Sequence, residues 1–237
     1  MSNPYFSFKQ FTVFHDLCAM KVGIDGVLLG VWCDIRDTNR ILDIGTGTGL
    51  IALMMAQRCD ALIDAIDIDA DAVLQATENI KQSPWPERIK VEQIALQDYT
   101  STTNNRYDLI VSNPPYFVNS LKAPAENRSV ARHTDTLTHE DLILQSKELL
   151  NPTGRICIIL PVNEAMLCKE FAISSGLFCT REVKVIPKPN AAPKRTLMEF
   201  SLQQGESEVT ELVIEGEVRH HYSDEFNLLA KDFYLKL

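Results

Sequence analysis

Residues 40–49 read RILDIGTGTG, and this stretch decides the fold. Its first half, 40–44, is a short apolar run that predicts a buried strand, and the alternating glycines that follow predict a tight loop. Residues 50–59 carry an apolar face at helical spacing. A strand, a glycine-rich loop and a helix in this order let the backbone approach a ligand closely, because glycine has no Cβ in the way.

The spacing of the glycines separates two kinds of nucleotide ligand. Dinucleotide-binding folds carry G-x-G-x-x-G, which would require a third glycine where this chain has Leu50. The chain instead has G-x-G-x-G, beginning at Gly45. The next predicted strand, 61–66, leads into Asp67, which is placed to accept hydrogen bonds from ribose hydroxyls. Together with Asp98 after a third strand, the loop favours an adenosyl cofactor held across three strand ends.

The rest of the chain alternates between short apolar runs and amphipathic segments, which is typical of βαβ units around a mostly parallel sheet. Strands are predicted at 40–44, 61–66, 89–94, 107–112, 154–160, 178–186 and 197–203, and helices at 50–59, 69–82, 138–150, 163–174 and 224–235. We therefore predict a Rossmann-like α/β fold with a seven-stranded, mostly parallel sheet, helices on both faces and an antiparallel last strand. One domain would span 1–237: a lead-in over the cofactor site (1–39), a core (40–205) and a C-terminal extension (206–237).

Residues 113–116, Asn-Pro-Pro-Tyr, directly follow the predicted strand 107–112. The two prolines fix φ and remove two backbone donors, so this turn offers carbonyl acceptors and few N–H groups. The side-chain oxygen of Asn113 and the carbonyl of Pro114 can each accept one hydrogen of a planar amino group. An aromatic face beside them can stack on the same group, a contact worth ~1–3 kcal/mol for a base. The alternative is a rigid turn that merely ends a strand, and the earlier glycine loop favours the functional interpretation. The predicted catalytic residues are Asn113, Pro114, Pro115 and Tyr116.

With these residues in place, the sequence resembles the class I S-adenosylmethionine-dependent methyltransferases that act on exocyclic or amide nitrogen through an Asn-Pro-Pro-Tyr motif. The resemblance covers residues 20–203, and LDIGTGTG at 42–49 is a specific match. The segment from 11–13 through 20–32 looks like the lead-in of the bacterial tRNA1(Val) adenine N6-methyltransferases. That family modifies the adenosine 3′ to the anticodon, at tRNA position 37. The resemblance implies methyl transfer from S-adenosylmethionine to N6 of that adenine.

The same resemblance implies a set of cofactor contacts. Residues 21–26 would fold over the methionine end, Asp67 would bind the ribose, Ile68 would pack on the adenine and Asp98 would bind the adenine amino group. The implied cofactor-binding residues are Lys21, Asp25, Asp43, Gly45, Thr46, Gly47, Gly49, Asp67, Ile68, Asp98 and Asn113. Hydrogen bonds from the target amino group to Asn113 and Pro114 would expose its lone pair, so no strong general base is needed.

Other functions share parts of this pattern. A protein-glutamine N5-methyltransferase of the release-factor type uses the same motif, but usually has a longer N-terminal domain than the 39 residues found before Arg40. Ribosomal RNA guanine or adenine amino methyltransferases are a further alternative, although the guanine N2 enzymes often have duplicated domains. A DNA adenine methyltransferase would want a target-recognition domain, for which no segment is free. A non-catalytic cofactor-binding module, from a different class, has no use for paired acceptors at 113–116.

The charges limit the kind of nucleic-acid contact. The chain has 23 Lys and Arg against 32 Asp and Glu, a net charge of −9, which argues against a surface that binds nucleic acid throughout. Basic residues nevertheless gather in two segments, 117–133 and 181–195, which are expected near the strand ends. The second segment also holds Arg181 and Lys184. The predicted tRNA-contacting residues are Lys122, Arg128, Arg132, His133, Lys188, Lys194 and Arg195. We expect a small, salt-sensitive footprint on phosphates, with solvated surface charge as the alternative.

The sequence lacks the signals of several other classes. Its six cysteines and five histidines show no metal-ligand spacing, so no metal site is predicted. A secretory signal and an apolar run of about 20 residues are both absent, so no membrane contact is expected. We expect a cytoplasmic monomer with S-adenosylmethionine as its cofactor and tRNA as its partner. The sequence suggests no role for the last 30 residues.

Overall fold

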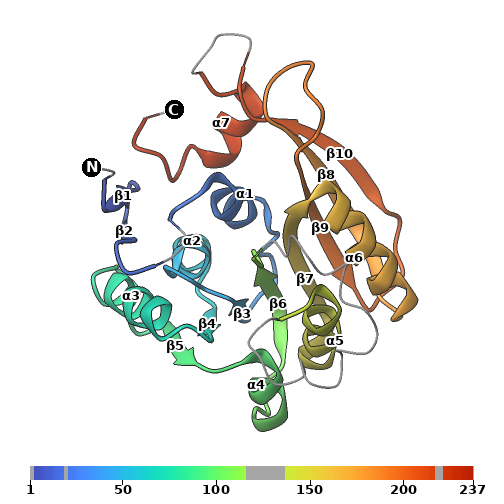
Figure 1. Cartoon of the computed structure of the whole chain (residues 1–237), viewed down its shortest axis with the longest axis horizontal. Helices are drawn as coiled ribbons and strands as arrows, with labels where there is room; N and C mark the ends of the chain where they lie inside the picture. The colour runs from blue at the N-terminus through green and yellow to red at the C-terminus, as the bar shows by residue number, and fades with distance from the viewer. Residues whose placement is uncertain (1–2, 19–20, 116–136, 217–220, 237) are drawn as a thin grey trace, which may run out of the picture.

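The computed structural model describes residues 3–18, 21–115, 137–216 and 221–236. Five predicted site residues fall outside these ranges: Tyr116, Lys122, Arg128, Arg132 and His133. The strands are β1 (Tyr5–Ser7), β2 (Thr12–Phe14), β3 (Arg40–Ile44), β4 (Leu62–Asp67), β5 (Ile89–Gln93), β6 (Tyr107–Ser112), β7 (Leu150–Pro161), β8 (Phe178–Ile186), β9 (Arg195–Ser201) and β10 (Glu208–Val213). The helices are α1 (Ile24–Trp32), α2 (Leu50–Arg58), α3 (Ala70–Lys81), α4 (Leu96–Thr102), α5 (His139–Leu149), α6 (Val162–Ser174) and α7 (Asp224–Ala230) (Figure 1).

Eight of the described strands form one sheet, in the order β10-β8-β9-β7-β6-β3-β4-β5, and β1 pairs with β2 in a separate hairpin. The strands from β7 to β5 in this order are parallel, and β9 is antiparallel to both of its neighbours, β7 and β8. The chain builds outward from β3 in one direction through β4 and β5, and then in the other through β6 and β7. The order therefore reverses between β3 and β6, which is where ligands bind in open α/β sheets.

The fold class predicted from the sequence is confirmed, and the strand count differs from it by one. The antiparallel strand is β9, as expected, but an eighth strand, β10, pairs in parallel with β8 from Glu208 to Val213. Its glutamates obscured it, because an edge strand needs few apolar contacts and commonly carries charge. Only Leu212 of this strand is buried, while Val209 is 53% exposed.

Helices cover the two faces of the sheet in separate groups, as Figure 1 shows. Residues of α1, α2, α3 and α7 join one hydrophobic cluster, and residues of α4, α5 and α6 join the other. Alternate residues of β3 face opposite ways, so Ile41 belongs to the first cluster and Leu42 to the second. Because β3 is buried on both faces, its apolar residues do not alternate with polar ones, and Asp43 is the one charged residue among its four buried positions.

Helix α1 was not predicted, and its burial explains why. Every residue from Gly26 to Trp32 is buried, so the helix has no polar face to reveal its period. Two glycines let it pack closely on α2: a Cβ at Gly26 would lie 3.0 Å from Leu50 Cδ2, and one at Gly30 would lie 2.5 Å from Met54 Sδ. These contacts match the start of α1 with the start of α2, so the two helices run in the same direction.

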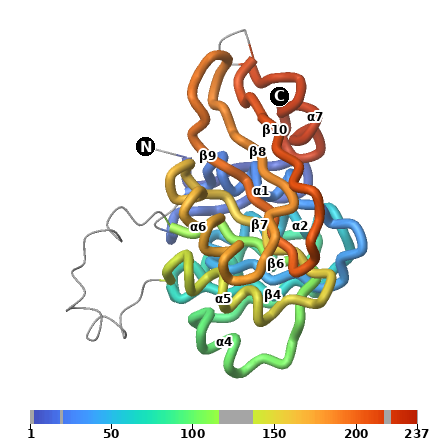
Figure 2. The backbone as a smooth tube through the Cα atoms, turned by 90° about the vertical axis from the view of Figure 1, so that its right-hand side faces the viewer, coloured from blue at the N-terminus to red at the C-terminus, as the bar shows by residue number. Residues whose placement is uncertain are grey.

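The two ends of the chain pack together beside α1. The backbone N–H of Lys9 donates to the carbonyl of Phe233 (2.8 Å), and Phe8 forms a bridge with Tyr234. Figure 2 shows α7 beside β10, next to the strands that rise furthest from the rest of the sheet. One hydrophobic cluster includes residues of the lead-in, of the core and of the C-terminal segment. This shared core supports our proposal that 1–39, 40–205 and 206–237 form a single domain.

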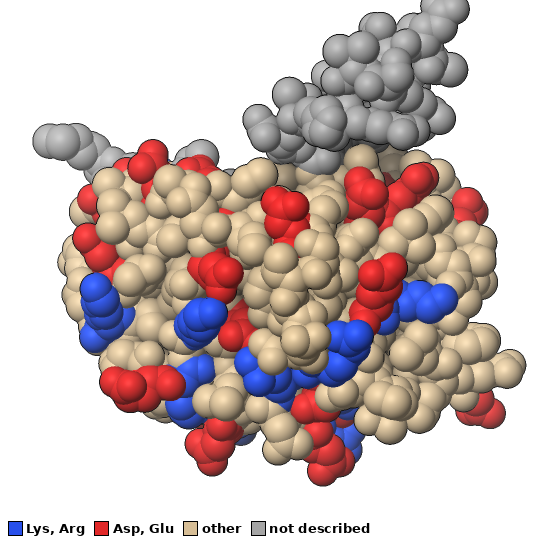
Figure 3. Space-filling model, turned by 90° about the horizontal axis from the view of Figure 1, so that it is seen from below, with Lys and Arg blue, Asp and Glu red and all other residues tan. Residues whose placement is uncertain are grey.

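Charge is mixed on the surface seen in Figure 3. Lysine and arginine side chains run across the middle of this face, with acidic side chains above and below them. The view therefore shows no continuous basic surface, as a net charge of −9 leads one to expect.

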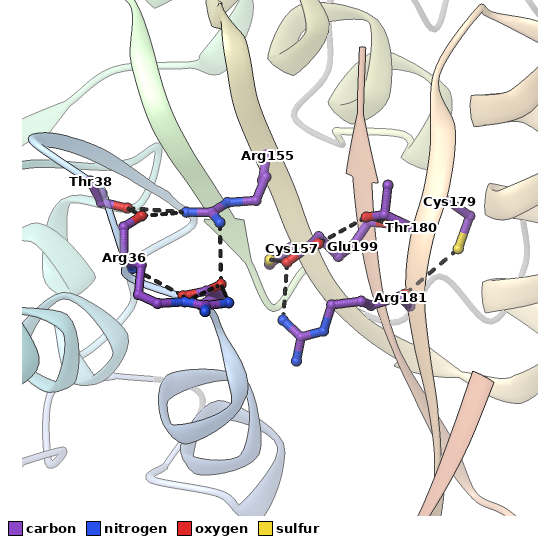
Figure 4. A network of polar contacts seen from close by, with 9 residues as sticks. Arg36, Thr38, Arg155, Cys157, Cys179, Thr180, Arg181 and Glu199 are labelled. Carbon is purple, nitrogen blue, oxygen red and sulfur yellow. Dashed lines mark hydrogen bonds and ion pairs between the residues drawn. The ribbon is translucent and has the colours of Figure 1, made fainter. Parts of the chain in front are cut away.

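Figure 4 shows two groups of polar contacts. One joins β7 to the segment after α1, and the other joins β7, β8 and β9 to one another. Glu199 on β9 is 5% exposed and pairs with Arg181 on β8 (Nη1 to Oε2, 3.2 Å). The Arg181 guanidinium also lies 4.4 Å from the centre of the Trp32 ring. Arg155 on β7 donates to the carbonyl of Arg36 (3.0 Å). Arg181 thus serves the fold, away from the strand ends where its basic segment was expected.

Replacing Arg181 should destabilise the fold. Arg181→Leu leaves the buried Glu199 carboxylate without its cationic partner, and we expect a loss of about 1–3 kcal/mol in the free energy of unfolding. This is below the cost for a fully buried pair because the Arg181 side chain is 29% exposed. Urea denaturation measures the change. Lys184→Leu, on an exposed position of the same strand, is the control and should change stability by less than about 0.5 kcal/mol; an equal effect of both variants would contradict the assignment.

Candidate functional site

The candidate site lies where β3 and β6 end side by side. Ile44 and Ser112 are register partners at these ends, and the Ser112 hydroxyl donates to the Ile44 carbonyl (2.9 Å). The glycine loop leaves β3 at the next residue, and the Asn-Pro-Pro turn leaves β6 at the next residue. The two motifs singled out in the sequence therefore start from adjacent points of the sheet.

The glycine loop has a backbone that other residues rarely adopt. Gly45, Gly47 and Gly49 have φ values of 69°, 55° and 78°. A Cβ at Gly45 or Gly47 would meet no atom of the described residues within 4 Å, so the loop borders space that these residues leave open. At Gly49 it would lie 3.4 Å from the Ala76 side chain, so this glycine instead lets the loop pack on α3. The loop therefore leaves its backbone open on one side and packs on a helix on the other.

Asp43 supports the loop from beneath and keeps one acceptor unused. Its Oδ2 accepts from the Thr46 hydroxyl (2.7 Å) and from the Ala52 N–H (3.2 Å). Its Oδ1 is buried with no hydrogen-bond partner among the described residues. Complete burial raises the pKa of Asp43 to about 7, against the lowering effect of these two hydrogen bonds. A donor or a cation from a ligand would compensate the buried charge.

Asp67 ends β4 and holds the loop from the side. Its Oδ2 accepts from the Gly47 N–H (2.8 Å), and its Oδ1 accepts from the Asp69 N–H (3.0 Å). The next residue, Ile68, is 52% exposed, an apolar side chain on the surface directly after the carboxylate. Asp98 is exposed in the first turn of α4, which follows β5, and Ile94 between them donates to the Asp67 carbonyl (2.9 Å). These residues lie at the ends of β4 and β5, and with the glycine loop after β3 they occupy three adjacent strand ends, as the sequence suggested.

The turn after β6 presents an amide oxygen. Asn113 is partly buried, and its Oδ1 is buried without a hydrogen-bond partner among the described residues. Pro114 is buried and Pro115 is exposed. The structure thus places an unused acceptor at the end of β6, next to the glycine loop. Tyr116, the last residue of the motif, lies outside the described residues.

Two residues predicted for different ligands contact each other. Arg195 Nε donates to Asp25 Oδ2 (2.8 Å), although Asp25 was expected to bind cofactor and Arg195 to bind RNA. Asp25 lies in the first turn of α1, and Arg195 begins β9 in register with Pro161, at the end of β7. The ion pair therefore links the lead-in to the loop between β8 and β9. Lys21, four residues before Asp25, is exposed.

The loop between β8 and β9 lies at the same edge of the sheet as the glycine loop. Strand β8 ends at Ile186 and β9 begins at Arg195, and both points are level with the end of β7. Lys188 and Lys194 are exposed in this loop, and the Lys194 N–H donates to the Val185 carbonyl (2.9 Å). The structure thus brings two of the basic residues predicted for RNA to the edge that carries the site.

Two amide side chains beside the site were not predicted from the sequence. Gln75 and Asn79 of α3 are each 1% exposed, and Asn79 Nδ2 donates to the Thr48 carbonyl of the glycine loop (2.9 Å). The sequence does contain a sign of them, because two amides four residues apart on an otherwise apolar helix face need buried hydrogen-bond partners. That signal marks a pair of buried hydrogen-bonding groups without saying what they bind.

The described residues form neither a metal-ligand cluster nor a membrane-spanning helix. No group of three or more histidine, cysteine, aspartate or glutamate side chains in those ranges is arranged to hold a metal ion. Among the helices of residues 3–18, 21–115, 137–216 and 221–236, none combines the length and apolar character needed to cross a membrane.

Comparison with known proteins agrees with this geometry. Residues 27–174 match the family described as methyltransferase small domain. A solved structure of a predicted O-methyltransferase from Agrobacterium tumefaciens superposes with a TM-score of 0.69, covering 88% of this chain and 96% of that chain. At 16% sequence identity, this likeness supports the fold alone.

Two relatives are similar over their whole length. A tRNA1(Val) (adenine(37)-N6)-methyltransferase from Parabacteroides distasonis is 54% identical, and one of the same name from Bacteroides fragilis (strain YCH46) is 50% identical. Each alignment covers 100% of this chain and 100% of the relative. The chain belongs to the tRNA1(Val) (adenine(37)-N6)-methyltransferase family.

Proposed function

We propose that this protein transfers a methyl group from S-adenosylmethionine to the exocyclic N6 of adenine in tRNA, with position 37 of tRNA1(Val) as the target. One observation carries the proposal. The glycine loop follows β3 and Asn113 follows β6, and these two strands are adjacent and pair at Ile44 and Ser112. The Oδ1 of Asn113 has no hydrogen-bond partner among the described residues. A cofactor held by the loop and an amino group held by Asn113 would then meet. Family membership supports the same reaction.

The residues present fit S-adenosylmethionine. Space without side chains borders Gly45 and Gly47, and the buried Asp43 Oδ1 lacks a partner among the described residues. Asp67 keeps lone pairs for ribose hydroxyls beyond its two backbone bonds, since a carboxylate has about four acceptor sites. The exposed Ile68 offers an apolar surface to adenine, and Asp98 offers an acceptor to its amino group. The sulfonium of this cofactor supplies an electrophilic methyl group.

Asn113 and Pro114 orient the target nitrogen. An aromatic amine is a weak nucleophile because its lone pair is delocalised into the ring. Hydrogen bonds from the amino group to the Asn113 side-chain oxygen and the Pro114 carbonyl favour a more tetrahedral nitrogen, whose lone pair is then directed at the methyl group. These are placed acceptors and need no strong general base, since the proton can leave after transfer. Tyr116 is proposed to stack on the extruded base.

Exposed lysines beside the site are proposed to contact the tRNA backbone. Lys188 and Lys194 share the edge of the sheet with Asn113, and their contacts would position the anticodon loop without reading its sequence. Arg195 belongs to the same proposal, although its ion pair with Asp25 ties it to the protein. Lys122, Arg128, Arg132 and His133 remain predictions from the sequence, as do a monomeric state and a cytoplasmic location.

The reaction can be tested directly with labelled cofactor. The protein is incubated with methyl-labelled S-adenosylmethionine and total RNA from a strain lacking the enzyme, and the labelled nucleoside is then mapped. We expect N6-methyladenosine at position 37 of tRNA1(Val). Asn113→Ala should lower the rate about 10²–10³-fold, as the loss of one placed hydrogen-bonding group does, with less than about tenfold change in cofactor affinity. Label found only in protein would point to an amide methyltransferase and would contradict the proposal.

Cofactor affinity should rise with pH because of Asp43. Burial raises the pKa of this carboxyl to about 7 in the ligand-free protein, so it is mostly protonated at pH 6 and mostly ionised at pH 8. The positively charged sulfonium favours the ionised form, and we expect up to about tenfold tighter binding at pH 8 than at pH 6. Calorimetry measures the dissociation constant. Asp43→Asn should bind with little of this dependence, whereas an equally steep profile in the variant would exclude Asp43 as its source.

Charge reversal in the loop between β8 and β9 should weaken tRNA binding alone. Replacing Lys188 and Lys194 together by glutamate should lower tRNA affinity about tenfold or more at low salt and flatten its salt dependence. Cofactor affinity should stay unchanged. The control replaces Lys81 and Lys236, two exposed lysines, by glutamate with the same change in net charge. An equal loss in the control would show a general effect of charge, and unchanged tRNA affinity in the test variant would refute the contact.

A further inference from the structure

Two buried amides of α3 hold the chain of the lead-in. Asn79 Oδ1 accepts from the Phe14 N–H and Asn79 Nδ2 donates to the Phe14 carbonyl, both at 2.9 Å. One turn closer to the start of the helix, Gln75 Oε1 accepts from the Leu17 N–H (3.0 Å). The lead-in therefore runs along α3 toward the start of the helix, so the chain is moving toward Asp67, which precedes α3.

Asn79 also contacts the glycine loop. Its second amide hydrogen goes to the Thr48 carbonyl (2.9 Å), so one side chain bonds to the backbone of the lead-in and of the loop at once. Asn79 is 1% exposed, and the loop packs on α3 beside it through Gly49 and Ala76. The position of the lead-in is thereby fixed relative to the loop that is proposed to hold the cofactor.

The hydrogen bonds at Phe14 and Leu17 direct the chain at residue 18 toward the carboxylate proposed to bind the ribose. The pKa of the half-buried Cys18 thiol is raised to about 11, first by burial and then by nearby carboxylates, of which Asp67 has the largest effect and Asp69 the next. This electrostatic coupling agrees with the hydrogen bonds that direct residues 14–17 along α3. On the other side of the loop, the first turn of α1 packs on the first turn of α2.

We propose that residues 14–18 form the wall of the cofactor site on the side of Asp67, and that Asn79 is the positioning residue that holds this wall against the glycine loop. The inference rests on the proposed binding of S-adenosylmethionine. The strand ends would bound the adenosyl half of the site on one side. Residues 14–18, which are far from α3 in sequence, would bound it on another. The hydrogen bonds of the Asn79 side chain to described residues all go to backbone groups, and Asn79 acts through the segment it holds.

The first test uses the unmodified protein and its own cysteines. Cys18 and Cys59 are half-buried and the other four cysteines are buried, so these two are the thiols accessible to N-ethylmaleimide. Cys18 should react more slowly than an ordinary thiol because its pKa is raised, so the effect of the ligand is read as the change in its own rate. Cys59 follows α2 at the opposite end of that helix from the glycine loop and serves as the internal reference. Mass spectrometry of peptides gives both rates. Saturating S-adenosylhomocysteine should slow the modification of Cys18 about tenfold or more relative to Cys59, because the ligand would cover the wall.

The second test removes the amide. Asn79→Ala should raise the KM for S-adenosylmethionine about tenfold or more and leave kcat at saturating cofactor within about threefold, since two bonds that position the wall are lost while the reacting groups are untouched. The KM for tRNA should not change. Gln57→Ala is the matched control, because Gln57 Nε2 donates to the carbonyl of Asp232 (2.8 Å) and ties down a different segment. Its kinetic constants should match those of the unmodified protein.

The outcomes separate the two proposals. If equilibrium dialysis shows no binding of S-adenosylmethionine to the unmodified protein, the proposed function fails. If the ligand binds but the modification rate of Cys18 does not change, the wall lies elsewhere and the inference is overturned. A KM for Asn79→Ala equal to that of Gln57→Ala would also overturn it, as would a fall in kcat with KM unchanged. If Asn79→Ala does not fold, the protection of Cys18 alone decides.

Discussion

The reversal of strand order between β3 and β6 is the constraint on which the rest of the structure depends. Because later strands are added on opposite sides of this pair, the helices that follow β3 and β6 lie on opposite faces of the sheet, and ligands bind beside such a point in open α/β sheets. The glycine loop and the Asn-Pro-Pro turn both begin there. Next to Gly45 and Gly47, no described atom lies within 4 Å of the position that a Cβ would take.

Two aspartates on neighbouring strands show how the same residue serves stability or ligand binding. Asp64 on β4 accepts from the Tyr107 hydroxyl (2.7 Å) and from Arg40 (2.9 Å), so its buried carboxylate is neutralised within the protein. Asp43 on β3 has no cationic partner in the hydrogen bonds described, and its pKa rises to about 7 as a result of burial. The first arrangement supports the sheet. The second leaves a buried carboxyl without a cationic partner at the edge of the sheet where a cationic ligand is proposed to bind.

The sequence predicted the central elements well because their burial is periodic or complete over a short run. The strand at 40–44 matches β3 residue for residue, and the helix predicted at 163–174 matches α6 to within one residue. Helix α1 escaped because it is buried on all sides, and β10 escaped because an edge strand tolerates glutamates. Long-range pairing was also out of reach: Asp25 and Arg195 are 170 positions apart, and no local pattern relates them.

The site shows the same division. Glycine spacing and the residues after each strand identified the part of the site that the sheet itself organises, because parallel strands end at one edge by construction. The part of the proposed site that the lead-in forms is held by the side chains of Gln75 and Asn79, which hydrogen-bond to backbone groups. Backbone groups carry no sequence signature, so this half of the proposed site could not be predicted from the sequence.

The pairing of the two chain ends has a consequence for how the protein is made. The lead-in packs against residues 222–234 through Phe6, Phe8 and Tyr234, and the Lys9 N–H bonds to the Phe233 carbonyl. A ribosome synthesises the first of these segments some 200 residues before the second. The N-terminal hairpin therefore cannot complete its packing until residues 222–234 have been synthesised and have left the exit tunnel.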